Sequence, residues 1–338
     1  MVMRIAAAAA TALLVTIALS SQLAFAAPLV RDRSTPCRAL ALAGGGDRGA
    51  YQAGVFQAFV ENAPDQVTYD VVTGISAGSI NTAALCMYKQ GDEKAALDFV
   101  LGEWLSIVAS DIYKNWPLGI AEGFAVKSGL FSTAPLDAYL HSKVNVTETL
   151  ASGRKCVVGA TSLTRDAYTQ FDSTNANWLT ALRASSAVPG VFEAVTIGDE
   201  TFVDGGAEYM TPVSDALAKC AEVSDNLSID VILCIGLQLP DANHTWITPE
   251  VFLRTATLEA QNILMKNAQS ASVAFPNAKI RLVFPSKVLP GYFLTFKPEY
   301  AEEMIKVGYT DGINALKADG TLPEGFEAVE LDLSRFRK

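Results

Sequence analysis

The sequence has 338 residues, of which 50% are hydrophobic and 18% are charged, and its formal net charge at pH 7 is −10. This composition excludes an intrinsically disordered chain and supplies enough apolar material for one large domain or two modest ones. Because the sequence is acidic and has no run of basic residues, it is a poor candidate for binding nucleic acid or for strong attraction to an anionic bilayer by charge alone.

The first 26 residues differ from the rest of the chain. Arg4 precedes an uninterrupted run of apolar and small residues over 5–19, and Ala24 and Ala26 form an A-x-A pattern. This pattern predicts a signal peptide over 1–26, cleaved after Ala26, and a secreted or periplasmic mature protein. An uncleaved N-terminal anchor is the alternative, which so short an apolar run disfavours. No later segment has about 18 uninterrupted apolar residues, so we expect the mature protein to be soluble.

The five cysteines allow at most two disulfides in an oxidising compartment and leave one thiol over. They are Cys37, Cys86, Cys156, Cys220 and Cys234. Their spacing resembles no metal site, and the sequence does not fix their pairing. Because Cys86 and Cys234 fall within apolar runs, we interpret them as buried small hydrophobic residues rather than ligands or nucleophiles.

After Pro36 the chain alternates short apolar runs with longer segments of helical period, and no linker divides it. This pattern predicts one α/β domain over 27–338, with its motif-bearing core at about 38–215. The predicted strands are 38–43, 69–73, 155–161, 201–204, 229–239 and 279–284. The predicted helices are 49–62, 77–89, 251–274 and 298–316. An aromatic-rich region spans 99–140; we interpret its Trp104, Tyr113, Trp116 and Phe124 as ordinary packing rather than as contacts to a lipid interface or the walls of an acyl pocket.

The first predicted strand runs into the loop LAGGGDRGAY, residues 42–51. Gly44, Gly46 and Gly49 match G-x-G-x-x-G, a pattern typical of dinucleotide sites, but bare loop amides also suit the oxyanion of a reaction intermediate. A dinucleotide site needs an acidic residue at the end of the next strand, about 20 residues on. That strand instead ends near Ser76, and Asp70 precedes its apolar part. The sequence therefore favours an oxyanion loop over a nucleotide site.

The pentapeptide at 74–78, GISAG, lies between a predicted strand and a predicted helix. In this context G-x-S-x-G predicts a nucleophile elbow, with Ser76 on a strained turn framed by Gly74, Ala77 and Gly78. A serine that only caps the following helix is the alternative. Turns that follow neighbouring parallel strands lie at one edge of a sheet, so the loop amides and Ser76 are expected to converge on one carbonyl group.

A serine hydroxyl needs a base to become a nucleophile. The run FVDGG places Asp204 at the end of another apolar strand, although D-G-G by itself is also typical of an ordinary turn. The histidines of the sequence are His141 and His244. The order Ser76, Asp204, His244 permits an α/β-hydrolase triad, but the elbow follows a single strand, which is too early for that fold. His244 also lies in a polar run typical of a surface loop.

Three motifs in this order, GGGDRGAYQAGV, GISAGS and FVDGG, resemble the patatin-like phospholipases. The similarity also includes GLFSTAPLDAYL (129–140) and ALRASSAVPGVFEAV (181–195), and it covers about 40–212. The resemblance implies a three-layer α/β/α sandwich with a central, mostly parallel sheet. It also implies a Ser-Asp dyad that cleaves lipid acyl esters, at a membrane or micelle surface, without a metal or cofactor.

By motif position, the resemblance makes Ser76 the nucleophile and Asp204 the base. It assigns the oxyanion loop to Gly44, Gly45 and Gly46, with Arg48 at the usual basic position. The run 207–212, AEYMTP, departs from the family pattern, which commonly has an Asn shortly before the Pro. Glu208 in this run is expected to alter the charge around Asp204. A lipid-binding or storage protein of the same fold with little turnover is the alternative from a different class.

Overall fold

The computed structural model describes residues 32–235, 248–326, 331 and 333–336. Residues 32–338 form one compact unit by their internal contacts. The predicted signal peptide, its cleavage site and His244 lie outside the described residues. Within the described part of the chain, no helix combines the length and the apolar character needed to cross a membrane.

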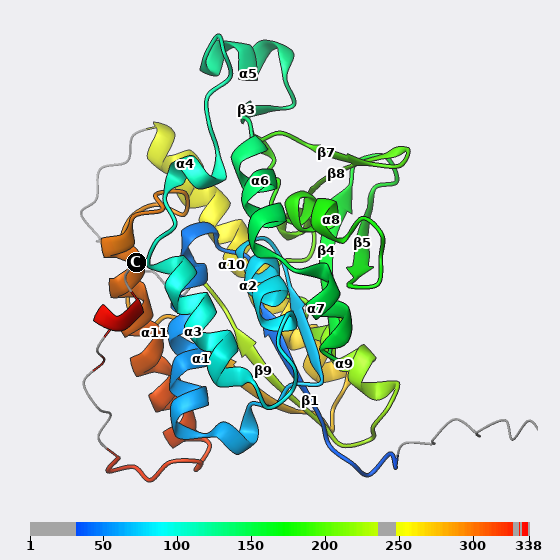
Figure 1. The fold of residues 1–338 in the computed structure, drawn as a ribbon, viewed down its shortest axis with the longest axis vertical. Coiled ribbons are helices and arrows are strands. Elements are labelled where there is room, and N and C mark those ends of the chain that lie inside the picture. Colours follow the sequence, from blue (N-terminus) through cyan, green and yellow to red (C-terminus); the bar gives the residue numbers. More distant parts are fainter. Residues whose placement is uncertain (1–31, 236–247, 327–330, 332, 337–338) are drawn as a thin grey trace, which may run out of the picture. The chain divides into compact units, whose positions relative to one another are not determined.

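The described chain is organised around an eight-stranded sheet with the order β10-β9-β1-β2-β4-β8-β7, in which β5 also pairs with β4 (Figure 1). Its strands are β1 (Cys37–Leu42), β2 (Val71–Gly74), β4 (Lys155–Ser162), β5 (Ala167–Asp172), β7 (Val195–Ile197), β8 (Glu200–Asp204), β9 (Leu227–Ile232) and β10 (Lys279–Val283). The run from β10 to β4 is parallel. Strands β5 and β8 each pair antiparallel with β4, and β7 pairs antiparallel with β8. A separate parallel pair joins β3 (Gly129–Phe131) to β6 (Gly190–Phe192).

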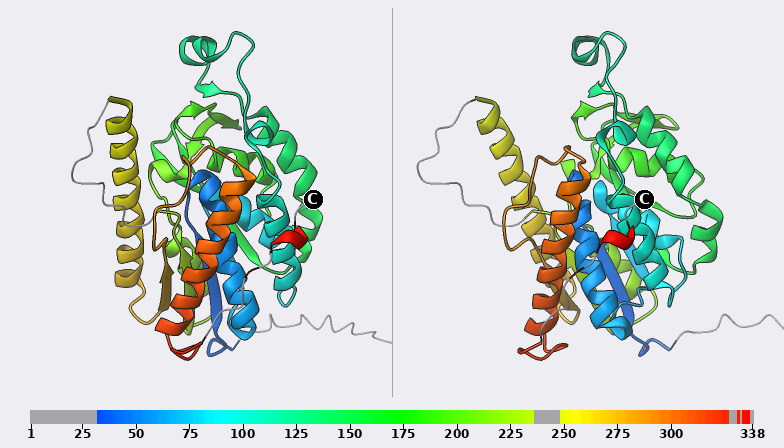
Figure 2. Two further views of the ribbon diagram at one scale, coloured as in Figure 1. Left: turned by 90° about the vertical axis from the view of Figure 1, so that its left-hand side faces the viewer. Right: turned by 60° about the vertical axis from the view of Figure 1, so that its left-hand side comes forward.

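Helices cover both faces of this sheet. They are α1 (Gly49–Asn62), α2 (Ala77–Cys86), α3 (Glu93–Trp104), α4 (Ala109–Ile112), α5 (Ile120–Val126), α6 (Ala134–Lys143), α7 (Val146–Ala151), α8 (Trp178–Ser185), α9 (Val213–Ala221), α10 (Thr248–Ala274) and α11 (Pro298–Ala318). Short 3-10 turns are η1 (Gly46–Arg48), η2 (Pro64–Gln66), η3 (Gly205–Ala207) and η4 (Ser334–Phe336). The long helices α10 (yellow) and α11 (orange to red) are prominent in Figure 2.

The layers follow from the alternation of side chains along the strands. In β1, Leu40 and Leu42 belong to the hydrophobic core that includes α1, α3 and α11. Ala39 and Ala41 belong to a second core with α9 and α10 on the other face. Both faces of the strand are therefore buried, as expected for a parallel sheet between two helical layers. This arrangement confirms the predicted three-layer α/β/α sandwich with a mostly parallel central sheet.

Two predicted elements extend too far. The helix predicted over 77–89 ends at Cys86, and the chain turns after Met87. The strand predicted over 229–239 is β9, which starts at Leu227 and ends at Ile232, while residues 236–239 lie outside the described part. After β9 the residues 233–235 remain buried, and burial alone does not distinguish a strand from a covered loop. After Cys86 the chain becomes progressively more exposed, and Lys89 lies at the surface.

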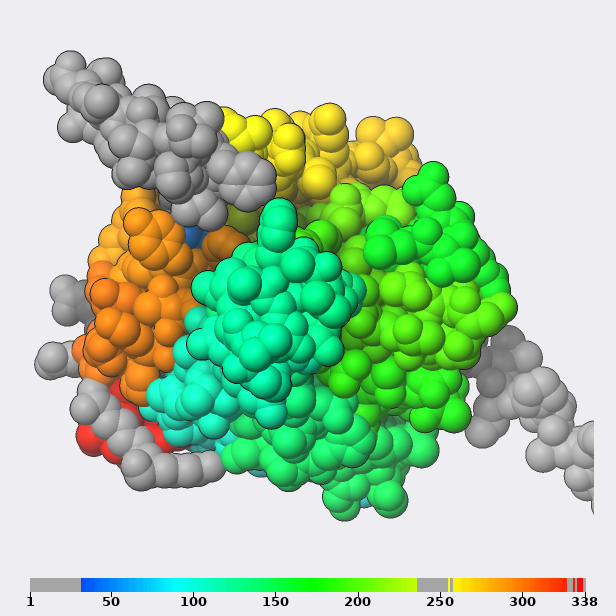
Figure 3. Space-filling model, turned by 90° about the horizontal axis from the view of Figure 1, so that it is seen from above, coloured from blue at the N-terminus to red at the C-terminus, as the bar shows by residue number. Residues whose placement is uncertain are grey.

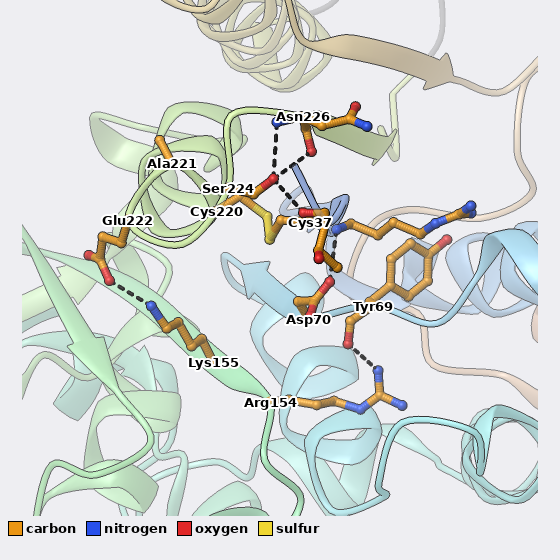
Figure 4. The surroundings of a disulfide bond; sticks show 12 residues. Cys37, Tyr69, Asp70, Arg154, Lys155, Cys220, Ala221, Glu222, Ser224 and Asn226 are labelled. Carbon is orange, nitrogen blue, oxygen red and sulfur yellow. Dashed lines mark hydrogen bonds and ion pairs between the residues drawn. A yellow bond between two sulfur atoms is a disulfide. The ribbon is translucent and has the colours of Figure 1, made fainter. Parts of the chain in front are cut away.

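Two disulfides join elements on both faces of the sheet. Cys37 at the start of β1 bonds to Cys220 of α9 (Figure 4), and Cys86 at the end of α2 bonds to Cys156 of β4. Cys86 is buried, as its position in an apolar run indicated, and its sulfur forms one of the two disulfides whose pairing the sequence left open. Cys234 is the free cysteine among the described residues, and burial raises the pKa of its thiol to about 12.

Candidate active site

Ser76 occupies the turn between β2 and α2. Its backbone has φ 54° and ψ −124°, a region that few residues other than glycine adopt. The turn is tight: a Cβ on Gly74 would lie 2.1 Å from the Gly78 carbonyl oxygen, and a Cβ on Gly78 would lie 2.1 Å from that of Leu42. The glycines of the elbow are thus required by close backbone contacts, and Ser76 as a residue is 7% exposed at the sheet edge.

Asp204 reaches the same edge from the opposite direction. Because β8 runs antiparallel to β4, its last residue pairs with Ala160, two positions beyond Val158. Val158 itself pairs with Gly74, which is two positions before Ser76. The register therefore places Asp204 level with Ser76, at the edge of the sheet where the parallel strands end.

Burial and hydrogen bonding act on Asp204 in opposite directions. Burial raises the pKa of this carboxyl to about 6, while hydrogen bonding from the Ser76 side chain and the Gly206 amide lowers it. The Gly206 amide donates to Oδ1 at 2.8 Å. The carboxylate is thus held by one backbone bond and addresses the serine hydroxyl directly, in the arrangement of a nucleophile and its base.

The glycine loop lies on the other side of Ser76. Gly44, two residues beyond Leu42, lies level with Ser76, and a Cβ at Gly44 would be 3.2 Å from the Ser76 Cβ. The Gly44 amide donates to the Met210 carbonyl oxygen at 3.1 Å, so it is already engaged. The amides of Gly45 and Gly46 have no hydrogen-bond partner among the described residues. Of the three predicted oxyanion glycines, these two retain available donors.

The comparison with protein families matches this arrangement. The model of the patatin-like phospholipases matches residues 40–217, which include the glycine loop, Ser76 and Asp204. The chain belongs to the patatin-like phospholipase family. Membership in this family indicates a lipid-hydrolysing enzyme and a lipid substrate.

Two curated proteins and one solved structure are similar to this chain over different shares of its length. The uncharacterized protein YjjU of Escherichia coli (strain K12) is 25% identical over 319 residues, which cover 88% of this chain and 82% of that protein. The calcium-independent phospholipase A2-gamma of Rattus norvegicus is 24% identical over 227 residues, 59% of this chain but only 28% of the rat protein. The crystal structure of VipD from Legionella pneumophila aligns with a TM-score of 0.40 and 12% identity, over 83% of this chain and 67% of that one.

Arg48, at the basic position of the family's loop, interacts with its immediate neighbours. Burial lowers the pKa of its guanidinium, and the charge of the neighbouring Asp47 carboxylate acts against that shift. Its Nε atom is buried without a hydrogen-bond partner among the described residues. The geometry therefore favours a role for Arg48 in the electrostatics of the loop, and it leaves the Gly45 and Gly46 amides as the donors available to an oxyanion.

Asp47 is a further residue of the site, and no motif in the sequence marks it. Its Oδ2 accepts hydrogen bonds from the amides of Thr295 and Phe296, both at 3.1 Å, and its own amide donates to the Phe293 carbonyl oxygen at 2.9 Å. These bonds attach a segment near the C-terminal end of the chain to the glycine loop. An acidic residue inside a glycine-rich loop was the available signal, but its partners are about 250 residues away in sequence.

The segment 207–212, which departs from the family pattern, brings Met210 into the site. A Cβ added to Gly44 or to Gly206 would lie only 2.6 Å from the Met210 sulfur. The sulfur therefore packs between the glycine loop and the turn after Asp204. Next to it, the Thr211 amide donates to Oδ1 of Asn267 in α10 at 3.2 Å. Glu208 is exposed, and it is not among the groups that shift the pKa of Asp204.

A narrow apolar cavity of about 40 Å³ opens beside Ser76. Its lining is formed by Gly46, Ser76, Ala77, Ile80, Trp104, Ile107, Ile112, Leu136, Tyr139, Ser186, Val188, Phe192, Leu294 and Phe296. Trp104 therefore contributes to this wall, rather than to packing remote from the site. Hydrocarbon side chains next to a nucleophile suit an acyl chain better than a polar substrate.

The described histidine lies away from this cavity lining. His141 is exposed on α6, and its Nδ1 contacts the Asp137 carbonyl oxygen at 2.8 Å. Its neighbours Leu136 and Tyr139 on the same helix line the cavity, but His141 does not. His244 lies outside the described residues.

Ser185 at the end of α8 supports the elbow. The Ser76 amide donates to Ser185 Oγ at 3.0 Å, and Ser185 is fully buried. We expect Ser185→Ala to lower kcat about tenfold with a smaller change in KM, because the strained Ser76 backbone loses its acceptor at a cost of about 1–3 kcal/mol.

Ser152→Ala is the matched control. Ser152 Oγ also accepts a hydrogen bond from a buried backbone amide, that of Arg154, at 3.2 Å. This bond lies before the start of β4, at the end of the strand away from Ser76. The two variants should lose similar stability, but only Ser185→Ala should lose turnover. Equal kcat values in steady-state assays of the two variants would contradict a positioning role.

Proposed function

We propose that the chain is an exported hydrolase that cleaves the carboxylic esters of phospholipids or other lipids through an acyl intermediate on Ser76, with Asp204 as its base. The observation that carries the proposal is the direct approach of the buried Asp204 carboxylate to the Ser76 side chain. Two unpaired loop amides and an apolar cavity beside the same serine provide the remaining parts of an acyl-transfer site.

The geometry suggests the following steps. Asp204 accepts the hydroxyl proton as Ser76 Oγ attacks the ester carbonyl carbon, and the amides of Gly45 and Gly46 donate to the resulting oxyanion. The C–O bond to the alcohol breaks, and the alcohol leaves with the proton from Asp204. Water then attacks the acyl-serine with the same proton transfers, which releases the fatty acid and restores the hydroxyl of Ser76.

The disulfides favour the exported part of the proposal. Four of the five cysteines are paired in Cys37–Cys220 and Cys86–Cys156. Such bonds persist in the secretory pathway, in the periplasm and outside the cell, and are rare in reducing compartments. This agrees with the secretory signal peptide expected over 1–26, and it supports a secreted or periplasmic location.

A fluorophosphonate probe tests the nucleophile, because it phosphonylates an activated serine irreversibly. We expect one adduct, on the peptide that contains Ser76, and its loss in Ser76→Ala. Hydrolysis of phospholipids, galactolipids, triacylglycerols and short p-nitrophenyl esters should fall together in that variant.

The outcomes separate the alternatives. Absence of labelling and turnover in the folded protein would favour the lipid-binding or storage function. Residual turnover of Ser76→Ala at the rate of the unmodified protein would place the nucleophile elsewhere. Folding of the variant is checked by its thermal unfolding temperature, which should match that of the unmodified protein within a few degrees.

A further inference from the structure

The segment 113–131, here called the α5 hairpin, stands out from the carboxyl edge of the sheet (Figure 1). It exposes four large apolar side chains, Leu118, Ile120, Phe124 and Val126, of which Leu118 is 81% and Phe124 84% accessible. Single exposed apolar side chains are normal, but a group of four on one projecting segment marks an interaction surface. The interpretation of Phe124 as a packing residue is therefore wrong.

The hairpin is internally ordered, so this exposure is a property of its fold. Lys114 and Ser132 form a β-bridge at its base, and β3 pairs with β6. Trp116 Nε1 donates to the Gly129 carbonyl oxygen at 3.0 Å, and the Lys127 ammonium lies 4.7 Å from the centre of the Trp116 ring. These contacts hold the hairpin together through polar and aromatic groups, while its large apolar side chains remain exposed.

The charges of the hairpin do not oppose contact with a bilayer. In a chain of net charge −10, residues 113–131 contain Lys114, Lys127 and a single acid, Glu122. Glu122 accepts the Leu118 amide at 3.0 Å and pairs with Lys127 at 3.4 Å. Because the acid is neutralised internally, the hairpin can approach phospholipid headgroups without the repulsion expected from the chain as a whole.

The base of the hairpin is continuous with the wall of the Ser76 cavity. The Tyr113 ring lies 5.5 Å from that of Phe192, which lines the cavity, and the Tyr113 hydroxyl donates to the Leu294 carbonyl oxygen at 3.2 Å. The 284–297 segment adds exposed Val288 and Tyr292. Figure 3 looks down on this face and shows the hairpin in teal and the region of that segment in orange. Exposed apolar groups and the catalytic cavity thus share one face.

We propose that the α5 hairpin inserts into the surface of a phospholipid bilayer or micelle and places the Ser76 cavity against it. The choice of lipid as the partner rests on the proposed function, since the substrate is itself embedded in that surface. A second copy of the chain on the same face would stand between Ser76 and its substrate. Leu118 and Phe124 at the tip provide the buried apolar area, as Trp and Phe side chains do in other interfacial segments.

Flotation with phosphatidylcholine vesicles tests the proposal. All proteins carry Ser76→Ala, so that the lipid is not consumed. We expect Leu118→Ser combined with Phe124→Ser to weaken partitioning on the order of 100-fold, because each lost apolar contact is worth about tenfold or more. Val273→Ser is the matched control, because Val273 is also 81% exposed but lies near the end of α10, which leads to the amino edge of the sheet. The control should partition like the parent protein.

A second measurement separates this proposal from the proposed function. With Ser76 intact, the double variant should hydrolyse a soluble p-nitrophenyl ester at the parent rate and vesicle phospholipid far more slowly. Vesicle binding that depends on the hairpin, in a protein that cleaves neither substrate, would support insertion and refute the hydrolase.

Unchanged partitioning of the double variant, or equal loss in Val273→Ser, would overturn the proposal. A dimer in solution that the double substitution dissociates, without an effect on vesicle binding, would assign the face to a second copy and also overturn it.

Discussion

Asp204→Asn is expected to lower kcat by at least about 10²–10⁴-fold, the usual contribution of a general base, and to approach the inactivity of Ser76→Ala. The amide keeps the size of the carboxyl and can still accept from the Gly206 amide, which now lies 2.8 Å from Oδ1. What it loses is the capacity to take the serine proton. The measurement is kcat on a soluble ester, so that binding to lipid surfaces does not enter.

Asp230→Asn is the matched control for this substitution. Asp230 is also buried with a raised pKa, but it lies on β9, accepts from the Tyr69 hydroxyl at 2.6 Å and takes no part in the site. It should lose stability without losing turnover. His141→Ala and His244→Ala should both be nearly neutral. A loss in His244→Ala as large as that in Ser76→Ala would replace the dyad by a histidine triad.

The same assignment fixes the sign of the pH dependence. The base acts only when ionised, so kcat/KM should be constant at neutral pH and fall tenfold per unit below the pKa of Asp204, about 6. From the sequence, a carboxylate base is expected to stay active well below the imidazole pKa of about 6.5. Burial removes most of that difference, so the position of the acid limb does not distinguish the two bases. The variants of Asp204 and His244 do.

The glycine loop and Ser76, which follow the parallel strands β1 and β2, could be predicted from the sequence. A glycine loop after β1 and a G-x-S-x-G turn after β2 lie side by side whenever those strands are parallel neighbours, and the observed register has this arrangement. The local glycine patterns were sufficient because both motifs depend on short-range backbone geometry. The layered α/β fold followed from the same alternation of apolar runs and helical segments.

The rest of the site depends on long-range pairing. Nothing in the run around Asp204 indicates that β8 is antiparallel to β4, which is what returns the carboxylate to Ser76. Ser185 reaches the site through a hydrogen bond to a residue 109 positions away in sequence. Met210, in the run that departs from the family pattern, reaches it by packing against Gly44 and Gly206. The interpretation of Phe124 as packing was wrong because aromatic content does not reveal which side of a segment lacks a partner.

Gly46→Ala is expected to lower kcat by about 10²–10³-fold, the effect of losing one oxyanion donor. Gly46 has φ +61°, and a Cβ there would lie 1.7 Å from the Phe293 carbonyl oxygen, so either the glycine loop or the 284–297 segment must move. That carbonyl accepts the Asp47 amide, which means that the displacement reaches the neighbouring loop residue as well. A loss of turnover in Gly46→Ala therefore needs a control for backbone strain.

Gly198→Ala provides that control. Gly198 has a similar φ of +65° in the exposed turn before β8, and no atom lies within 4 Å of its Cβ position. Both substitutions place an alanine in a left-handed conformation at a cost of about 1–3 kcal/mol, so this share of the stability loss is common to them. Only the Gly46 variant also displaces donors at Ser76. If thermal unfolding shows that Gly46→Ala is folded and its kcat equals that of Gly198→Ala, the two glycine amides do not bind the oxyanion.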